Sequence, residues 1–326
     1  MAFANHENRC MGAILAGPVS RSDKTAAAHR AVRDGQAGIA EFEKAIESDR
    51  IQIVSSQKNF AFVSGGQSDW LDIMRPLAHG LPGFEKRQTS GEDSIGPVTR
   101  WFSTNTFYRK PTIIGQIRSL GNEISGALPE IQNGIAFLLG PYSFCRLVEN
   151  SHYKNNAELM GDYSKAIVAN LAQLGRKGYK CILFLEPCIG YEQPSKKLET
   201  PAGYLEALDI VSGKGLKLGI HFPQANGALA IPIVEDARID FVGIDGIHTD
   251  FSKVSTRKDL LLGIVDGGRA GIEGADSLKN EIARFQSEAQ FSGRYYIGPN
   301  DRLFDVPFGI ALEKIRALSA LGEQPL

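Results

Sequence analysis

Polar side chains follow most of the apolar runs in this sequence, at the point where each run ends. In GIHFPQANG, residues 219–227, an apolar run stops just after His221. It is followed by Pro-Gln-Ala-Asn-Gly, which is a sequence typical of a turn. Another run, CILFLEP, ends on Glu186 just before Pro187. Imidazole and carboxylate groups can bind divalent metal ions or transfer protons. The ends of these runs are therefore the candidate functional positions.

The candidates at these ends include several carboxylates. In chain order they are Ser20 with Arg21, Gln67 with Asp69, Tyr142 with Ser143, Glu186, His221, Asp245 with His248, Asp266 with Arg269, and Asn300 with Asp301. Carboxylates that converge on one small volume cannot all stay ionised without a cation or a raised pKa. One source of positive charge is a metal ion held by His221, Asp245 and Asp301. The other is an arginine turned inward, with three candidates: Arg21, Arg109 and Arg269.

Each candidate also has a simpler interpretation. His221 could be a hydrogen-bonded residue at a rim, and Asp245 and Asp266 could cap the turns that follow them. His248, three residues after Asp245, could instead join Asp245 and His221 in a facial triad suited to non-haem iron. Glu186 is harder to explain as structural, because an Ile-Leu-Phe run has little reason to end on a carboxylate. The catalytic candidates are Glu186, Asp266 and His248.

Eight apolar runs, separated by charged amphipathic stretches, must position these residues. They are AILAG (13–17), FAFVSGG (60–66), IAFLLGP (135–141), CILFLEP (181–187), LGIHFP (218–223), FVGIDG (241–246), LLGIVDG (261–267) and YYIGPN (295–300). Runs that are apolar on both faces are typical of parallel strands covered by helices. The stretches between them favour helices at 23–35, 40–57, 163–178, 275–289 and 307–323. This alternation predicts an α/β fold, a single (β/α)8 TIM barrel over residues 1–326.

One segment is too long for an ordinary connection in such a barrel. Residues 84–130, between the second and third runs, include the stretch WFSTNTFYRKP. We predict an inserted excursion over the barrel mouth. Its aromatic residues could stack on a flat ring while Arg109 or Lys110 holds an acidic tail, or they could fix the excursion to the rim.

Composition limits the partners. The chain has 326 residues, of which 43% are hydrophobic, and 36 basic residues nearly balance 37 acidic ones. A net charge of −1 gives no electrostatic footprint for nucleic acid. The apolar runs CMGAILAGPV and IAFLLGPYSF are too short for a membrane span, and Gly-Pro interrupts both. The first of them lacks the basic region and the cleavage site of a signal peptide. We therefore predict a cytoplasmic protein with small-molecule partners and without nucleic-acid or membrane partners.

The strand ends, taken in order, resemble those of one known family. LAGPVSR is similar to a Gly-Ser-Phe-Pro-Arg turn, FVSGGQSDWLDIM to a Gly-Glu-x-x-x-x-Asp-Met pattern, and WFSTNTFYRKP to a Thr-Asn-x-x-Tyr-x-x-Pro element. LLGPYSF, FLEPCIGYE, LLLGIVDGGRAGIEGADSL and IGPNDRLFDVPFGIALEKI are similar to its later strand ends. These motifs resemble the catalytic, C-terminal or archaeal-type barrel of cobalamin-independent methionine synthase. That barrel is one of the methyltransferase barrels that include uroporphyrinogen decarboxylase.

The resemblance implies a zinc site whose ligands have changed. The family holds zinc with a His-x-Cys pair, a glutamate one strand later and a cysteine after the last strand. In this chain His221 is kept and Pro223 replaces the first cysteine. Asp245 stands at the glutamate and Asp301 at the final cysteine. One imidazole with two carboxylates is a harder ligand set, which suits iron or manganese as well as zinc.

The resemblance also implies a reaction. The family transfers a methyl group from methyltetrahydrofolate, or from a methyl-corrinoid, to a small thiol such as homocysteine in methionine biosynthesis. The substrate-binding candidates are Gln67, Arg21, Asn105, Tyr108, Arg109, Lys110 and Tyr142. Pro18 and Leu185 stand where the family contacts the amino acid. Either the acceptor differs from homocysteine, or Glu186 and a neighbour bind it instead.

Two other hypotheses fit the same residues. One is a repurposed metal-dependent lyase, decarboxylase or oxygenase on the same barrel. The other is a non-catalytic accessory protein that works beside another enzyme. A corrinoid protein or an accessory protein is also a possible partner of the methyltransferase that the resemblance implies.

Overall fold

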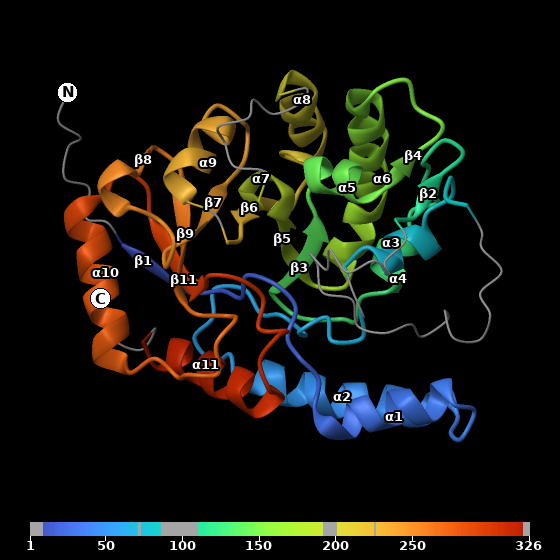
Figure 1. Cartoon of the computed structure of the whole chain (residues 1–326), viewed down its shortest axis with the longest axis horizontal. Helices are drawn as coiled ribbons and strands as arrows, with labels where there is room; N and C mark the ends of the chain where they lie inside the picture. The colour runs from blue at the N-terminus through green and yellow to red at the C-terminus, as the bar shows by residue number, and fades with distance from the viewer. Residues whose placement is uncertain (1–8, 71–72, 86–109, 192–200, 225, 322–326) are drawn as a thin grey trace.

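The computed structural model describes residues 9–70, 73–85, 110–191, 201–224 and 226–321. Its centre is a curled parallel sheet with helices packed outside it (Figure 1). The seven strands of this sheet follow the order β1-β11-β9-β7-β6-β5-β3. Their bounds are β1 Cys10–Ala13, β3 Gly134–Leu139, β5 Tyr179–Leu185, β6 Lys217–Phe222, β7 Phe241–Asp245, β9 Asp259–Val265 and β11 Tyr295–Pro299. Because all of these strands run parallel, their carboxyl ends meet at one edge of the sheet.

The predicted strands agree with the sheet at six of the eight runs, within a few residues at each end. β1 begins and ends earlier than the predicted run at 13–17. The run at 60–66 forms isolated parallel bridges instead of a strand, from Ala13 to Phe60 and from Val63 to Gly134. Segment 60–63 therefore lies between the edge strands β1 and β3. It ends early because Gly66 and Gln67 have positive φ angles of 82° and 44°, which an extended strand does not tolerate.

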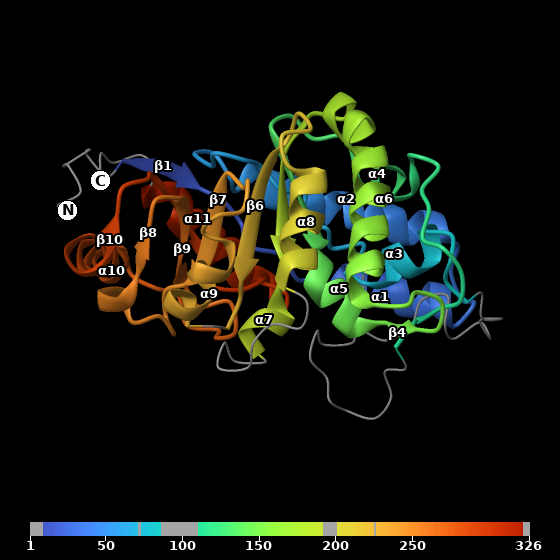
Figure 2. The same cartoon turned by 90° about the horizontal axis from the view of Figure 1, so that it is seen from above.

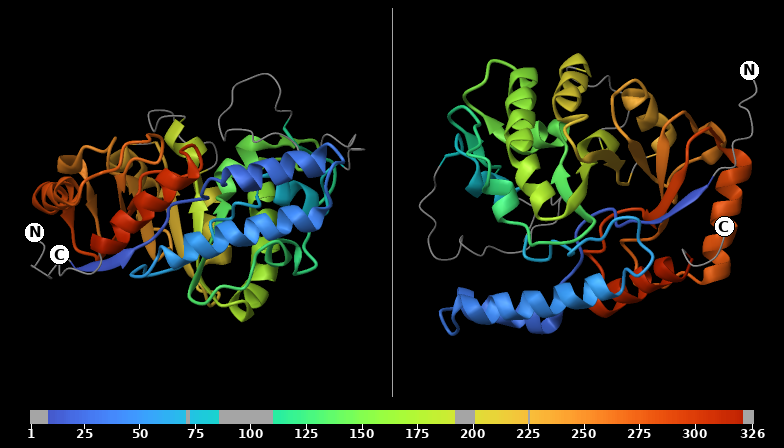
Figure 3. Two further views of the ribbon diagram at one scale, coloured as in Figure 1. Left: turned by 90° about the horizontal axis from the view of Figure 1, so that it is seen from below. Right: turned by 180° about the vertical axis from the view of Figure 1, so that it is seen from behind.

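Helices fill the intervals between strands. Their bounds are α1 Asp23–Arg33, α2 Ile39–Ser55, α3 Arg75–Gly80, α4 Glu123–Gly126, α5 Pro141–Leu147, α6 Asn156–Arg176, α7 Pro187–Tyr191, α8 Pro201–Val211, α9 Gly227–Val234, α10 Ala275–Glu288 and α11 Phe308–Leu321, with a 3-10 turn η1 at Phe251–Lys253. Ser22 caps α1 by accepting from the Thr25 backbone, and Asn155 caps α6 by accepting from the Glu158 backbone. Figure 2 shows α6 and α8 side by side, and Figure 3 shows α1, α2 and α11 together on one side of the sheet.

Burial explains why the strands are apolar on both faces. Every residue of β3 is buried, between the helices outside and the side chains of the other strands inside. On the outer side, Tyr163 of α6 stacks on Phe144 of α5 with ring centroids 3.8 Å apart. Each fully buried aromatic side chain of this size contributes about 2 to 3 kcal/mol through its apolar area. The strands are thereby held rigidly enough to position the residues at their ends.

The predicted excursion is described only at its two ends. After residue 110 the chain forms β2, Thr112–Ile113, which pairs in parallel with β4, Glu149–Asn150. A second small pair joins β8, Ser255–Thr256, to β10, Gln290–Phe291. Residues 86–109 lie outside the described residues, so the placement of the excursion over the barrel mouth stays a prediction. None of the helices in the described part of the chain combines the length and apolar character that a membrane span requires.

Candidate active site

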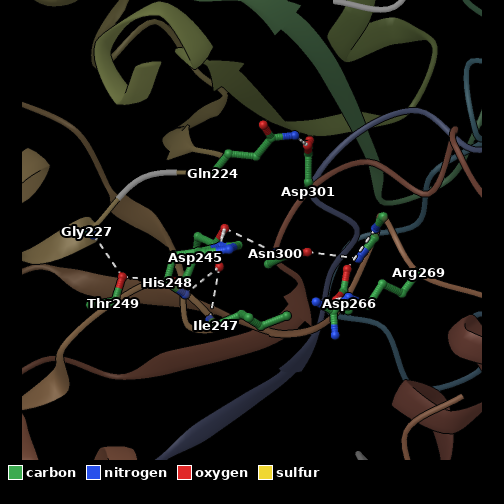
Figure 4. A network of polar contacts seen from close by, with 12 residues as sticks. Gln224, Gly227, Asp245, Ile247, His248, Thr249, Asp266, Arg269, Asn300 and Asp301 are labelled. Carbon is green, nitrogen blue, oxygen red and sulfur yellow. Dashed lines mark hydrogen bonds and ion pairs between the residues drawn. The ribbon is translucent and has the colours of Figure 1, made fainter. Parts of the chain in front are cut away.

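A polar cluster lies at the carboxyl ends of β6, β7 and β11, and Asn300 is at its centre (Figure 4). The Asn300 backbone oxygen lies 2.7 Å from His221 Nε2. Its side-chain Nδ2 donates to Asp245 Oδ2 at 3.1 Å, and its Oδ1 accepts from the backbone N–H of Gly267 at 2.8 Å. The close approach needs a glycine on β9, because a Cβ on Gly263 would lie 2.5 Å from the Asn300 Cα. We call His221, Asp245, His248 and Asn300 the Asn300 cluster.

His221 is fully buried near the end of β6. It stands opposite Gly243 on β7, and a Cβ on that glycine would lie 2.4 Å from His221 Nδ1. Since the Asn300 carbonyl can only accept, Nε2 must carry a hydrogen. Burial lowers the pKa of His221, partly offset by its bond to Asn300, which favours the neutral imidazole. His221 is therefore a buried donor in this arrangement.

Asp245 is fully buried, and both of its oxygens accept hydrogen bonds. Oδ1 accepts from the backbone N–H groups of Ile247 and His248, at 2.9 and 3.1 Å. Oδ2 accepts from Asn300 and lies 2.7 Å from His248 Nδ1. Asp245 thus shapes the turn after β7, as the simpler interpretation predicts, and it also orients an imidazole.

His248 forms a carboxylate and imidazole dyad with Asp245. Its side chain is 59% exposed, whereas that of Asp245 is 0% exposed. With Nδ1 donating to the carboxylate, Nε2 is the nitrogen that can accept a proton from a bound molecule. The dyad therefore has the chemistry of a general base at the carboxyl edge of the sheet.

Asp301 follows Asn300 and is also hydrogen-bonded within the protein. Its Oδ2 accepts from Gln224 Nε2 at 2.7 Å, and its Oδ1 accepts from the backbone N–H of Arg302 at 2.7 Å. Burial raises the pKa of Asp301, and the nearby charge of Arg302 lowers it in part.

The residues expected to bind a metal lie at neighbouring strand ends, and most of their polar atoms already have partners within the protein. The exception is His221 Nδ1, which is buried without a hydrogen-bond partner. His221 Nε2 donates to a carbonyl, and the oxygens of Asp245 and Asp301 accept from protein donors. Across the described ranges, no group of three or more His, Cys, Asp or Glu side chains is arranged to hold a metal ion. In this arrangement the residues do not fit a zinc, iron or manganese site. A metal held by His221, Asp245 and Asp301 stays a prediction.

Glu186 is fully buried after β5, next to the first turn of α5. Its Oε1 accepts from the backbone N–H of Tyr142 at 3.1 Å, and its Oε2 accepts from that of Ser143 at 2.8 Å. Gly140 makes room for the carboxyl group, because a Cβ there would lie 2.1 Å from Oε1. Burial outweighs these hydrogen bonds and raises the pKa of Glu186 to about 7.

The raised pKa of Glu186 predicts a pH-dependent stability. Between pH 5 and 7 the folded protein holds a proton that the unfolded chain has released, so stability falls as pH rises through this range. A difference of roughly two pKa units corresponds to about 3 kcal/mol. We expect urea unfolding from pH 5 to 8 to show this loss in the wild type and much less of it in Glu186→Gln, which mimics the protonated group.

Glu41→Gln is the control for this measurement, because Glu41 is exposed on α2. It should retain the pH dependence of the wild type. Identical profiles for the wild type and Glu186→Gln would contradict the assignment of the buried proton to Glu186.

Asp266 lies at the end of β9 and forms the turn that follows it. Its Oδ1 accepts from the backbone N–H of Gly268 at 2.9 Å, and its Oδ2 lies 3.4 Å from Nε of the exposed Arg269. The Asp266 backbone N–H donates to Glu273, which forms an ion pair with the buried Lys314 of α11. The catalytic role predicted for Asp266 stays a prediction, and its described contacts are those of a turn residue.

Gln67 and Arg21 bind the protein backbone. Gln67 Nε2 donates to the Phe137 oxygen at 3.0 Å and its Oε1 accepts from the Phe137 N–H at 2.6 Å, so the amide takes the place of a strand partner for β3. Arg21 Nε donates to the Ser68 oxygen at 2.5 Å, and its guanidinium lies 5.8 Å from the ring centre of Phe42. Burial lowers the pKa of Arg21 to about 10.

The other substrate-binding candidates lie apart from the Asn300 cluster or outside the described residues. Tyr142 is buried, with its ring 6.1 Å from that of Tyr204. Lys110 is exposed, and its Nζ donates to the backbone oxygen of Arg146 at 2.8 Å. Asn105, Tyr108 and Arg109 lie outside the described residues.

Sequence reasoning gave no role to two residues that organise this edge of the sheet. Asn300 stood among the strand ends, but nothing in the sequence indicates that its side-chain amide joins β7 to the turn after β9, or that its backbone oxygen contacts His221 of β6. Lys314 lies within the amphipathic pattern of α11, where a lysine normally faces solvent. The signal for both is tertiary, because their partners come from distant parts of the chain.

Comparison with known proteins identifies relatives. The family model described as "Cobalamin-independent synthase, N-terminal domain" matches residues 84–286. Methionine synthases of Saccharolobus solfataricus and Saccharolobus islandicus are 24% and 23% identical over 213 residues, which is 62% of this chain and 62% of each relative. The chain thus spans less than two thirds of the length of these curated relatives.

Solved structures share the fold. A B12-independent methionine synthase from a Shewanella species, in complex with selenomethionine, is 15% identical with a TM-score of 0.70, over 96% of this chain and 97% of that one. A putative vitamin-B12 independent methionine synthase from Listeria monocytogenes is 14% identical with a TM-score of 0.72, over 98% of both chains.

The resemblance read from the strand ends is confirmed at the level of the family. The matching model is that of the family's N-terminal domain, so it does not select the catalytic domain to which the motifs were compared. Because the model covers more than half of the sequence, the chain belongs to the cobalamin-independent synthase family.

Proposed function

We propose that the chain is a methyltransferase of the cobalamin-independent methionine synthase type. It transfers a methyl group from methyltetrahydrofolate, or from a methyl-corrinoid, to a small thiol such as homocysteine. The reaction takes place at the carboxyl edge of the sheet, where enzymes with this fold place their catalytic groups. Segment 60–63 takes the position of the eighth strand and closes the barrel between β1 and β3. The parallel bridges from this segment to Ala13 and to Gly134 support this.

The observation that carries the proposal is the dyad of Asp245 and His248. Methyl transfer to sulfur requires a thiolate, because the thiol itself is a weak nucleophile. The buried carboxylate keeps the hydrogen of His248 on Nδ1, so that Nε2 accepts the thiol proton. The exposed side chain of His248 is accessible to a substrate, whereas the fully buried Glu186 is not.

The proposed reaction consists of one proton transfer and one methyl transfer. The thiol proton moves to His248 Nε2, and the sulfur attacks the methyl carbon in line with the bond to the donor. The new carbon–sulfur bond forms as the donor bond breaks, and the donor keeps the electron pair. With a folate donor, the leaving nitrogen then takes up a proton. The protein contributes orientation of the two reactants and removal of the proton.

The remaining candidates have supporting roles in this proposal. Glu186 holds the first turn of α5, and Gln67 holds β3, so both fix the walls around the acceptor. Lys110 and Arg109 belong to the predicted excursion, residues 84–130, where a basic group would bind an acidic tail of the donor. A divalent metal is not part of the step, because the expected ligands do not fit one in this arrangement.

A second candidate function is a non-thiol reaction on the same barrel, such as a lyase or decarboxylase. The absence of cysteine from the expected ligand set favours it, since the changed positions carry Pro223, Asp245 and Asp301. The dyad would then remove a proton from carbon or oxygen instead of sulfur.

The two functions are separated by a transfer assay. Methyl-labelled methyltetrahydrofolate and methylcobalamin are each incubated with homocysteine and other small thiols, and mass spectrometry detects the methylated product. We expect His248→Ala to slow the transfer by about a thousandfold, because the general base is lost. Binding of the methyl donor, followed by thermal shift, should stay at the wild-type level.

His152→Ala is the matched control, because His152 is exposed and far along the chain from the dyad. It should leave the transfer rate unchanged. If neither donor protects the wild type from heat and no thiol is methylated, the methyl-transfer proposal fails and the non-thiol reaction takes its place.

A further inference from the structure

Every polar group of Asn300 has a partner, and the partners come from three strands, β6, β7 and β9, or the turn after β9. The backbone N–H donates to the Val265 oxygen of β9 at 2.8 Å, and the backbone oxygen accepts from His221 of β6. The side chain joins the Gly267 N–H after β9 to Asp245 at the end of β7. Asn300 itself directly follows β11.

The orientation of the Asn300 amide follows from these partners. The backbone N–H of Gly267 can only donate, so the atom facing it is the amide oxygen. The amide nitrogen therefore faces Asp245 and must be a donor, as a carboxylate requires. An aspartate at this position would lack that donor and would place a second negative charge beside Asp245.

Protein donors, together with the charge of Arg302 near Asp301, thus compensate the strand-end carboxylates. Asp245 accepts from two backbone N–H groups, the Asn300 amide and His248. Asp301 accepts from the Gln224 amide and a backbone N–H. Carboxylates that are solvated by fixed donors in this way need no cation at their centre.

We propose that Asn300 takes the structural place of a metal ion, so that the Asn300 cluster is held together without a bound divalent cation. The amide fixes Asp245, and the backbone carbonyl fixes His221. In this proposal the chain departs from the ligand chemistry that the resemblance implies. It rests on the proposed function only for the location of the site, since the contacts of Asn300 are independent of the reaction.

Metal content tests the proposal directly. The wild type is incubated with excess zinc and dialysed, and zinc per chain is measured by mass spectrometry. We expect no zinc above the buffer level, and an unchanged melting temperature when a chelator is added. The proposal is overturned if the wild type retains stoichiometric zinc and His221→Ala loses it while staying folded. The same measurement is repeated with iron(II) and manganese(II).

Asn300→Asp should convert the cluster into a metal site. It would place a second carboxylate beside Asp245 in place of the amide that now donates to it, close to His221 and His248, and we expect about one zinc ion per chain after dialysis. Asn155→Asp is the matched control, because Asn155 is an exposed helix cap far from the cluster, and it should retain no zinc. A folded Asn300→Asp variant without zinc would contradict the role given to Asn300.

The wild-type measurement decides the matter even if Asn300→Asp does not fold. It is also separate from the proposed function. A protein that retains no zinc and methylates no thiol would refute the methyl transfer and leave the role of Asn300 intact.

Discussion

Replacing Asp245 with asparagine is expected to slow the proposed methyl transfer by about a thousandfold, while the protein stays folded and binds the proposed methyl donor as the wild type does. The Oδ1 contacts to the backbone of Ile247 and His248 remain available to an asparagine oxygen. The amide nitrogen would then face His248 Nδ1 and Asn300 Nδ2, and both of these are donors in the wild type. His248 must change tautomer to accept from that amide, so its hydrogen moves to Nε2. An Nε2 that carries a hydrogen cannot take a proton from a thiol.

Single-turnover methyl transfer measures this effect apart from substrate binding. The rate of the chemical step should fall, and the donor concentration at half-saturation should change little. Asp250→Asn is the matched control, because Asp250 is exposed in the same loop and forms its ion pair with Lys253 at the surface. Its rate should equal that of the wild type. A folded Asp245→Asn variant with a wild-type rate would show that His248 is not the base.

Replacing Lys314 with methionine is expected to lower the free energy of unfolding by about 3 kcal/mol. The Lys314 side chain is 0% exposed, and its Nζ lies 3.0 and 2.8 Å from the two carboxylate oxygens of Glu273. Methionine fills a similar volume but leaves a largely buried carboxylate without its cation. Glu273 also accepts from the Asp266 backbone N–H, so the loop after β9 should loosen with it.

Urea unfolding and hydrogen exchange of residues 266–274 measure the two parts of this effect. Lys253→Met is the control, because the ion pair of Lys253 and Asp250 is exposed on both sides and salt and water already screen it. That control should change stability little. Equal stabilities for Lys314→Met and the wild type would contradict the view that this ion pair anchors the loop.

Six strands could be predicted from the sequence because their apolar runs are long enough to be buried on both faces, as in β3 and β9. The run at 60–66 begins with similar apolar residues but forms only bridges. The chain turns at Gly66 and Gln67, so the strand does not continue. The Gln67 side chain then forms the hydrogen bonds to the Phe137 backbone of β3 that a longer strand would have formed. Composition alone does not distinguish these outcomes, because both bury the same apolar residues.

The candidate site was predicted in part. His221 and Asp245 were identified because polar residues at the ends of parallel strands meet at one edge, and Asn300 does join them there. Their ligand atoms could not be predicted, since hydrogen bonds between distant segments decide which oxygen or nitrogen stays available. Glu186 illustrates the same limit, because its carboxylate is occupied by the backbone of α5.

The sequence by itself determined the alternating α/β pattern, the polar strand ends and the family to which the chain belongs. These depend on local periodicity and on residue order, which a linear chain displays directly. Only the tertiary structure decided that Asn300 holds His221 and Asp245, and that His248 is the exposed member of the dyad. The physical reason is that a side chain's protonation and partners depend on burial and on donors from other strands, which become neighbours only when the sheet curls.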